Sequence, residues 1–275
     1  MSTPNISFIG AGNMARSLIS GLIADGRDPA TIWISDRNDD QRLLLEQQFH
    51  LHATASNIEA AENSDIVILA VKPQVMQTVC QELRDTVQQK RPLVVSIAAG
   101  IRELDINRWL GGDVAIVRAM PNTPSLIKTG ATALFANSRV SSAQRNNAET
   151  ILRAVGLALW IEDEALMRAV TALSGSGPAY FFLFIEAMEE AARDLGLADE
   201  TARLLALQTA FGATKMALES PENCATLRRR VTSPGGTTEQ AILTFENNGL
   251  RALVAKALSA AANRSDELAQ ELGAQ

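Results

Sequence analysis

The sequence is poor in the side chains that bind metals. Only two cysteines and two histidines occur among its 275 residues. Cys80 and Cys224 stand alone, without a CxxC pair or other ligand spacing, and His50 and His52 flank a predicted loop without acidic partners. We therefore expect no metal site and interpret all four side chains as structural or solvent-facing.

Concentrated positive charge and long apolar segments are also missing. The net charge is −6, and the densest basic cluster, Arg228–Arg230, is short, so nucleic acid is not expected as a partner. The apolar run Tyr180–Met188 is interrupted by Glu186 and cannot span a bilayer, and Ile6–Ile9 lacks the length and basic flank of a signal peptide. These absences predict a cytoplasmic protein that binds neither membranes nor nucleic acid.

The chain does have a globular balance of residues, 47% hydrophobic and 20% charged, over a length that allows two domains. Its first part alternates short apolar strands with helical stretches, which predicts a parallel sheet with crossover helices. The predicted strands are Asn5–Ile9, Thr31–Ser35, Ile66–Val71 and Leu93–Ile97, with Val114–Val117, Thr132–Phe135 and Ala158–Ile161 as extensions of the sheet and Ala143–Ala154 as a late helix.

From Glu162 onward the sequence shows no strand pattern. Ala- and Leu-rich helical stretches cover residues 166–173, 179–195, 200–218 and 250–272. We therefore place a boundary near Asp163, between an α/β domain over residues 1–163 and an all-helical domain over residues 164–275. The segment Tyr180–Ile185 is apolar on every side of its helix and must be buried all round, which a domain of about 110 residues achieves poorly alone. A homodimer of interleaved helices is the simpler solution.

A dinucleotide fingerprint follows the first predicted strand. In Gly10-x-Gly12-x-x-Ala15 the first Gly makes the tight turn, and the second lets the backbone approach the pyrophosphate closely. The small third residue lets the helix pack on the strand. Many structural turns match so short a motif, but this one opens a helix in an alternating β/α region. We predict that the diphosphate of a nucleotide cofactor meets this helix N-terminus.

The end of the second strand gives conflicting signals about the cofactor. Asp36 is the kind of residue that accepts from the ribose 2′-hydroxyl of NAD, whereas Arg37 accommodates the 2′-phosphate of NADP. If Asp36 turns away, Ser35 and Arg37 can hold that phosphate, so we favour NADPH and leave NADH open. The alternative is that Arg37 is merely a solvated charge.

Three more segments end apolar strands and so lie at the ligand-binding edge of the sheet. They are Ala70–Gln74, which includes Lys72, then Ser96–Gly100, and finally Arg118–Pro124, in which two prolines frame a polar pair. Small residues in the first two allow a flat ring to approach the backbone. We expect the third to shape the pocket floor beside the nicotinamide.

The segment Val231–Gln240 predicts a rigid turn that opens a helix. Pro234 fixes one backbone angle, Gly235 and Gly236 permit positive φ, and Thr237 or Thr238 can cap the apolar run that follows. Free N–H groups at such a helix start attract an anion, although a capped turn without a ligand is equally compatible with the pattern.

A catalytic base for alcohol oxidation is absent from the expected place. Two-domain dehydrogenases of the 3-hydroxy-acid and 6-phosphogluconate type begin their second domain with Gly-x-Gly-x-x-x-Lys-x-x-Asn. The corresponding segment here begins at Gly175 and has Phe181 and Phe184 where Lys and Asn would stand. Reduction of an imine is less demanding, because its carbon is already electrophilic and a Thr hydroxyl suffices at the nitrogen.

These motifs together resemble pyrroline-5-carboxylate reductases over nearly the whole chain. The matching segments are Gly10–Ala15, Ala70–Pro73, Ser96–Gly100, Arg118–Pro124, Ser174–Tyr180 and Val231–Thr238. The resemblance implies NAD(P)H-dependent reduction of L-1-pyrroline-5-carboxylate to L-proline, the last step of proline biosynthesis. It also implies a Rossmann domain followed by an all-helical dimerisation domain, with dimers often gathered into decamers.

The resemblance assigns roles to particular positions. It implies that Gly236, Thr237 and Thr238 present N–H groups to the substrate carboxylate within the turn that begins at Ser233, and that the Thr238 hydroxyl bonds the ring nitrogen, with water as the alternative proton source. Glu222 is a further expected substrate-pocket residue. The implied cofactor residues are Ile9, Gly10, Ala11, Gly12, Asn13, Met14, Ser35, Arg37, Asn57, Ala70, Val71, Lys72, Pro73, Ile97, Ala98 and Ala99.

Two other functions stay open at this point. One is reduction of a different imine or of a 3-oxo acid on the same scaffold, although Phe181 and Phe184 argue against the oxo acid. The other is a protein that binds NADP as a sensor without turnover.

Overall fold

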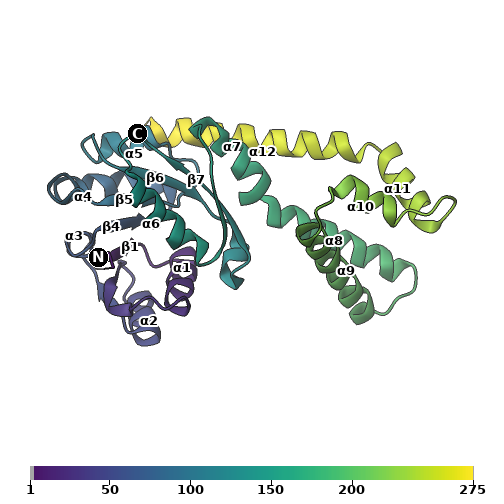
Figure 1. Ribbon diagram of the computed structural model, residues 1–275, viewed down its shortest axis with the longest axis horizontal. Coiled ribbons are helices and arrows are strands. Elements are labelled where there is room, and N and C mark those ends of the chain that lie inside the picture. Colours follow the sequence, from purple (N-terminus) through teal and green to yellow (C-terminus); the bar gives the residue numbers. More distant parts are fainter. Residues whose placement is uncertain (1–2, 275) are drawn as a thin grey trace. The chain divides into compact units, whose positions relative to one another are not determined.

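The computed structural model describes residues 3–274 and divides into two compact units (Figure 1). The first contains the chain up to Ser176 together with residues from Ala260 onward, and the second runs from Gly177 to Ser259. Residues 164–176 thus pack with the sheet, and the division into functional domains at residue 163 stays a prediction. The two units are described separately.

The first unit is built on one eight-stranded sheet with the order β3-β2-β1-β4-β5-β6-β7-β8. All neighbours are parallel except β6 and β7. The strands are β1 (Ile6–Ile9), β2 (Ile32–Ser35), β3 (His52–Thr54), β4 (Ile66–Leu69), β5 (Leu93–Ser96), β6 (Ile116–Met120), β7 (Gly130–Ala136) and β8 (Gly156–Trp160). All seven predicted strands are confirmed, and so is the predicted parallel pairing except between β6 and β7, which are antiparallel.

Strand β3 was missed, because three residues at a sheet edge are too few to show a period. The structure places His52 in this strand rather than beside a loop, with its ring stacked on Trp33 at a centroid distance of 4.5 Å. His50 ends the preceding helix in the left-handed conformation.

Helices cover both faces of the sheet. One face packs against α1 (Asn13–Ala24), α2 (Asp39–Phe49) and α6 (Ser142–Arg153), and the other against α3 (Asn57–Glu62), α4 (Met76–Lys90) and α5 (Glu103–Trp109). Every residue of β4 and β5 is buried, which explains their unbroken apolar sequences. Short 3₁₀ turns join these elements at Pro29–Thr31, Pro73–Val75, Thr123–Ile127 (η3) and Glu164–Leu166.

The first unit also contains the two segments that connect it to the helical unit. After α7 (Met167–Val170) comes one turn of π-helix, Thr171–Gly175. The chain returns within α12 (Leu250–Gly273), whose last turns dock on α5: Arg108 donates from Nη2 to the carbonyl of Gly273 at 2.6 Å. Arg168 on α7 forms an ion pair with Asp266 on α12 at 3.0 Å, which links these two connecting segments within the first unit.

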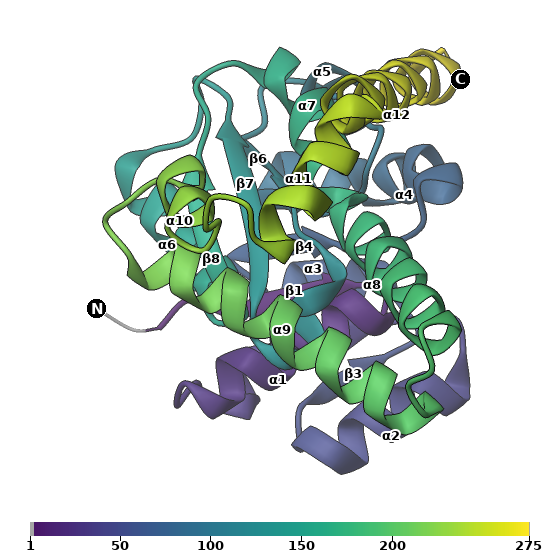
Figure 2. The same ribbon diagram turned by 90° about the vertical axis from the view of Figure 1, so that its right-hand side faces the viewer.

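The second unit is entirely helical, as predicted. It contains α8 (Gly177–Asp194), α9 (Asp199–Glu219), α10 (Cys224–Arg230), α11 (Thr237–Asn247) and the first turns of α12 (Figure 2). Helix α10 was missed, because seven residues with three consecutive arginines carry no apolar period; its start is fixed by Asn223, whose side chain accepts from the N–H of Thr226.

The apolar helix α8 is not covered within one chain. Phe181 and Phe182 are each 67% exposed and Leu183 is 65% exposed. A row of large exposed apolar side chains is unusual for a monomer and marks a contact surface for another protein. The burial predicted for this helix is therefore not provided by the described part of this chain, and its burial in a homodimer stays a prediction.

Candidate active site

A cleft of about 510 Å³ opens at the carboxyl ends of β1, β2 and β4. Predicted cofactor residues that line it are Gly10, Gly12, Ser35, Arg37, Asn57, Ala70, Val71 and Lys72. Ile9 and Ala11 are buried beside it, Asn13 and Met14 open α1, and Pro73 starts the next 3₁₀ turn. Residues Ile97, Ala98 and Ala99 follow β5 and are not among the lining residues.

The glycine loop is shaped to receive a flat, anionic group. Gly10 has φ of +100° and donates its N–H to the carbonyl of Ser35 at 2.8 Å. A Cβ at this position would lie 2.8 Å from the carbonyl oxygen of Ala70, so only glycine fits. Gly12 caps α1 without any side-chain hydrogen bond, which leaves N–H groups of the first turn for a phosphate. The loop thus fits a dinucleotide.

Asp36 is turned toward the glycine loop. Its Oδ2 accepts from the N–H of Ala11 at 2.8 Å and its Oδ1 from the N–H of Asn38 at 2.9 Å, so both oxygens hold backbone. Arg37 lines the cleft and makes no ion pair within residues 3–274. This is the arrangement in which the cation, rather than the carboxylate, is available to the cofactor.

Asn57 is oriented by two neighbours. Its Oδ1 accepts from the hydroxyl of Ser35 at 2.8 Å, and its Nδ2 donates to Oε2 of Glu82 at 2.9 Å. Glu82 was not predicted from the sequence, although it lies one helical turn after Thr78 and so shares the face of α4 that reaches the cleft. Glu82 itself is not a lining residue; unpredicted residues that do line the cleft are Asn38, Gln41, Val75, Thr78 and Val79.

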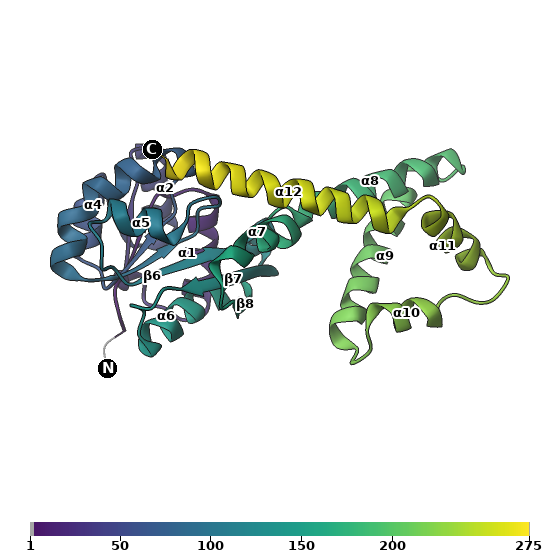
Figure 3. The same cartoon turned by 90° about the horizontal axis from the view of Figure 1, so that it is seen from above.

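The loop between α10 and α11 lies wholly in the helical unit (Figure 3). Gly235 has φ of +71°, its N–H donates to Oε2 of Glu239 at 2.7 Å, and the N–H of Gly236 donates to the carbonyl of Ser233 at 3.0 Å. The prediction that Thr237 or Thr238 caps the helix was wrong. Gly236, with extended backbone, is the capping residue, and both threonines already belong to the helix.

This geometry leaves donors free at the start of α11. Within the described chain, neither the backbone N–H groups nor the hydroxyls of Thr237 and Thr238 have a hydrogen-bond partner. They form a group of neutral donors at the positive end of a helix, suited to a carboxylate.

Glu222 lies just before α10 and pairs with Arg230 at 2.7 Å. The carboxylate is mostly covered, with 28% of its side chain exposed, whereas Arg230 is largely exposed. Since Arg230 is followed directly by the Val231–Gly236 loop, the ion pair fastens one end of that loop.

The positions of Phe181 and Phe184 carry no acid or base. The ring of Phe184 instead packs against Phe245 of α11, with a centroid distance of 6.1 Å. The aromatic side chain therefore supports the helix that bears Thr237 and Thr238.

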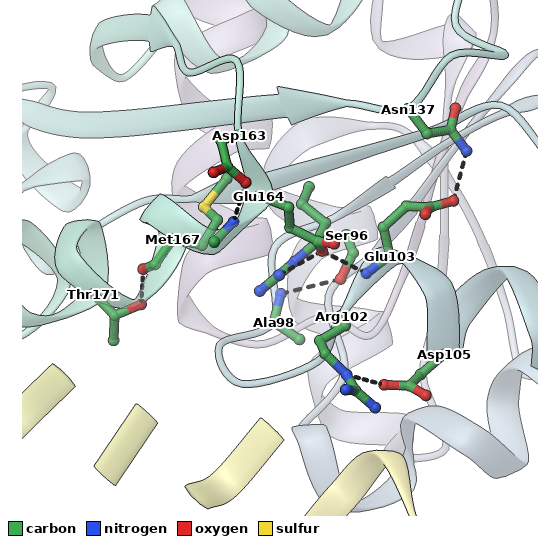
Figure 4. A network of polar contacts seen from close by, with 12 residues as sticks. Ser96, Ala98, Arg102, Glu103, Asp105, Asn137, Asp163, Glu164, Met167 and Thr171 are labelled. Carbon is green, nitrogen blue, oxygen red and sulfur yellow. Dashed lines mark hydrogen bonds and ion pairs between the residues drawn. The ribbon is translucent and has the colours of Figure 1, made fainter. Parts of the chain in front are cut away.

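A half-buried polar network follows the end of β5 (Figure 4). Oε1 of Glu164 accepts from the N–H of Glu103 and from Nη1 of Arg118, both at 2.6 Å, and Asn137 donates from Nδ2 to Oε1 of Glu103 at 2.6 Å. Burial raises the pKa of the Glu103 carboxyl, and the charge of Glu164 acts in the same direction, against the Asn137 hydrogen bond and the Arg118 charge. Sequence reasoning missed this network, because its members are far apart along the chain.

Residues 3–274 contain no group of three or more His, Cys, Asp or Glu side chains placed to hold a metal ion. None of their helices has the length and apolar character needed to cross a membrane.

Known proteins resemble this chain in sequence and in fold. The family described as pyrroline-5-carboxylate reductase dimerisation matches residues 164–268, and that described as NADP oxidoreductase, coenzyme F420-dependent, matches residues 5–100. Pyrroline-5-carboxylate reductase of Pseudomonas aeruginosa is 54% identical over 273 residues, which are 99% of this chain and 100% of that protein.

Solved structures agree with this. A pyrroline-5-carboxylate reductase from Coxiella burnetii is 51% identical, with a TM-score of 0.94 over 97% of this chain and 99% of that one. The pyrroline carboxylate reductase of Plasmodium falciparum, solved with NADP bound, is 28% identical, with a TM-score of 0.86 over 98% of this chain and 99% of that one.

Proposed function

The chain belongs to the pyrroline-5-carboxylate reductase family, and we propose that it performs the family's reaction with the residues described above. It reduces 1-pyrroline-5-carboxylate to proline, the last step of proline biosynthesis, with NAD(P)H as cofactor. The observation that best supports the assignment of roles is the free donor group at the start of α11. When bound, the cofactor supplies the hydride that the imine carbon accepts.

The substrate carboxylate is held by the helix start. Backbone N–H groups of Thr237 and Thr238 are the free donors for this anion, and the loop from Ser233 through Gly235 shapes the remaining wall. The N–H of Gly236, which was expected to join them, donates instead to the carbonyl of Ser233 at 3.0 Å. The Glu239 carboxylate strengthens the loop by holding the N–H of Gly235, at 2.7 Å. Glu222 is proposed to face the ring, on the side fixed by Arg230.

Thr238 orients the imine. Its hydroxyl can donate to the ring nitrogen and pass on a proton received from water, whereas a neutral Thr is too weak an acid to act alone. No stronger acid is required, since an iminium carbon is already electrophilic. The absence of a basic side chain at Phe181 and Phe184 fits the reduction of an imine better than the oxidation of an alcohol.

The cofactor is proposed to be NADPH in preference to NADH. Arg37 is the free cation at the end of β2, while both oxygens of Asp36 are engaged by backbone. A guanidinium can pair with the 2′-phosphate and stack on the adenine. The diphosphate would lie on Gly10–Met14 and the nicotinamide end toward Ala70–Pro73 and Ile97–Ala99.

The protein is a homo-oligomer, as its dimerisation region indicates. We propose a dimer with interleaved helical units, which can assemble further into a decamer, and a complete site that draws on two copies. The exposed Phe181 and Phe182 supply the apolar surface for such an interface. We also propose a cytoplasmic location and no nucleic-acid or membrane partner.

One assay tests the function. NADPH absorbance is followed with pyrroline-5-carboxylate, with a six-membered cyclic imine acid, and with a 3-oxo acid. We expect fast oxidation with the first. Turnover of the oxo acid alone would contradict the imine assignment, and binding of NADPH without turnover of any of the three would indicate a sensor.

A further inference from the structure

Asn122 lies outside the cofactor cleft and is bonded at both ends of its side chain. Its Nδ2 donates to the backbone carbonyl of Ser174 at 3.2 Å and to the hydroxyl of Ser174 at 3.3 Å, and its Oδ1 accepts from the N–H of Ala131 at 2.9 Å. Both contacts of Nδ2 go to the same residue, Ser174, and all the side-chain partners of Asn122 lie in the first unit. Asn122 therefore links parts of the chain to one another.

Ser174 belongs to the π-helical turn Thr171–Gly175. The turn is closed by a hydrogen bond from the N–H of Ser176 to the carbonyl of Thr171, at 2.8 Å. Single π turns are rare and are often found at functional sites. Here the turn comes directly before Gly177, where the helical unit begins. Asn122 thus anchors the last turn of the first unit.

A second contact joins the same two segments. Asn122 follows the end of β6 by two residues, and Cε of Met120, the last residue of β6, lies next to Gly175 of the π turn. The η3 turn that follows is joined to the cofactor helix α1, because the hydroxyl of Ser17 donates to the carbonyl of Ser125. A continuous set of contacts therefore runs from α1 to the π turn.

We propose that Asn122 is a positioning residue for hydride transfer. It holds the segment that follows β6, which we expect beside the nicotinamide, against the π turn, and so fixes how the hydride donor is presented. The inference rests on the proposed function, because it takes the carboxyl edge of the sheet as the cofactor site. Hydride transfer demands close alignment, and a displacement of about 1 Å can cost roughly 100-fold in rate.

The test is Asn122→Asp in the full-length protein. This change preserves size and the acceptor for Ala131, but places a carboxylate oxygen against the carbonyl of Ser174. We expect kcat to fall by about 10- to 100-fold while the Kd for NADPH changes by less than about twofold. Hydrogen exchange in the peptide that covers residues 171–178 should become faster. Should this variant not fold, Asn122→Ser carries the same expectations.

Asn137→Asp is the matched control. Asn137 is also bonded through both amide atoms in the first unit, donating to Glu103 and Val114 and accepting from Ile116, but it lies away from the π turn. We expect it to lower Tm without lowering kcat. An unchanged kcat in Asn122→Asp would overturn the inference, as would equal losses of kcat and NADPH affinity.

The two claims can fail separately. If the wild-type protein does not reduce pyrroline-5-carboxylate, the proposed function fails, and hydrogen exchange still tests the anchor. Unchanged exchange over residues 171–178 in Asn122→Asp would then overturn it. Faster exchange confined to that peptide would support it.

Discussion

Asp36 accepts a hydrogen bond from the backbone N–H of Ala11 at 2.8 Å, which links the glycine loop to the end of β2. An acidic residue at this place in a dinucleotide-binding fold usually bonds the ribose 2′-hydroxyl. Here its second oxygen accepts from Asn38, and the neighbouring Arg37 is unpaired in the described chain. Because both oxygens of Asp36 already accept from backbone N–H groups, this segment can contain an acidic residue and still be compatible with the 2′-phosphate of NADPH.

The first prediction concerns Arg37. Arg37→Ala should raise the KM for NADPH by about 10- to 100-fold, since a hydrogen bond to a charged group contributes about 1.5–3 kcal/mol. The KM for NADH should change little, because NADH has no 2′-phosphate. Steady-state kinetics with both cofactors measure this. Arg153→Ala, which removes a guanidinium paired with Glu149 on α6, is the control and should leave both values unchanged. An equal rise in KM for both cofactors would show that Arg37 does not bind the 2′-phosphate.

The second prediction concerns the cradle for the diphosphate. Gly10→Ala should abolish detectable NADPH binding, because its Cβ would press on the Ala70 carbonyl and φ is +100°. Gly26→Ala is the matched control: φ is +90°, but no atom lies within 4 Å of the added Cβ. It should cost about 1–2 kcal/mol of folding free energy through backbone strain and preserve NADPH affinity. Calorimetric titration separates the two, and normal binding by Gly10→Ala would rule out the proposed cradle.

The third prediction concerns the substrate loop. Thr238→Ala should lower kcat for the imine by about 10- to 100-fold, because the ring nitrogen loses its hydrogen-bonding partner. NADPH affinity should stay within about twofold of wild type, since the cofactor binds in the other unit. Thr244→Ala is the control on the same helix: within residues 3–274, the Thr244 hydroxyl bonds only the carbonyl of Gln240. Equal losses of turnover and NADPH affinity in Thr238→Ala would contradict its assigned place.

The fourth prediction concerns pH. Burial raises the pKa of Glu103 above its ordinary 4.5, so the folded protein holds this proton more tightly than the unfolded chain. Its contribution to the free energy of unfolding is fully present below pH 4.5 and is lost as pH rises through the pKa of Glu103 in the folded protein. Glu103→Gln does not titrate and can still accept from Asn137. Its Tm relative to wild type should therefore increase from acid to neutral pH. A difference independent of pH would show that Glu103 titrates alike in both states.

Local sequence was sufficient for the features that depend on neighbouring residues. The glycine loop, the buried strands and the long apolar helices each carry a pattern within a few turns, and the sheet and helical regions were predicted from them. The edge strand at His52 and the helix at Cys224 were missed because their stabilising contacts, the Trp33 ring and the Asn223 cap, are not periodic.

Side-chain partners across the fold were harder to predict. The direction of Asp36 depends on a backbone N–H that lies 25 residues earlier in the chain, and Glu164 meets Arg118 across 46 residues. The cap of α11 illustrates the same limit. Threonine is a good capping residue in general, but the cap is Gly236, one or two residues earlier than predicted, and both hydroxyls are left free.

The central claim is that this chain delivers a hydride to the carbon of a five-membered cyclic imine. The most direct measurement uses NADPH deuterated at the transferable position of the nicotinamide, incubated with pyrroline-5-carboxylate and the wild-type protein, followed by NMR of the product. We expect proline with one deuterium on the ring carbon next to the nitrogen that bears no carboxylate. Proline without deuterium at that carbon, or no proline at all, would contradict the account.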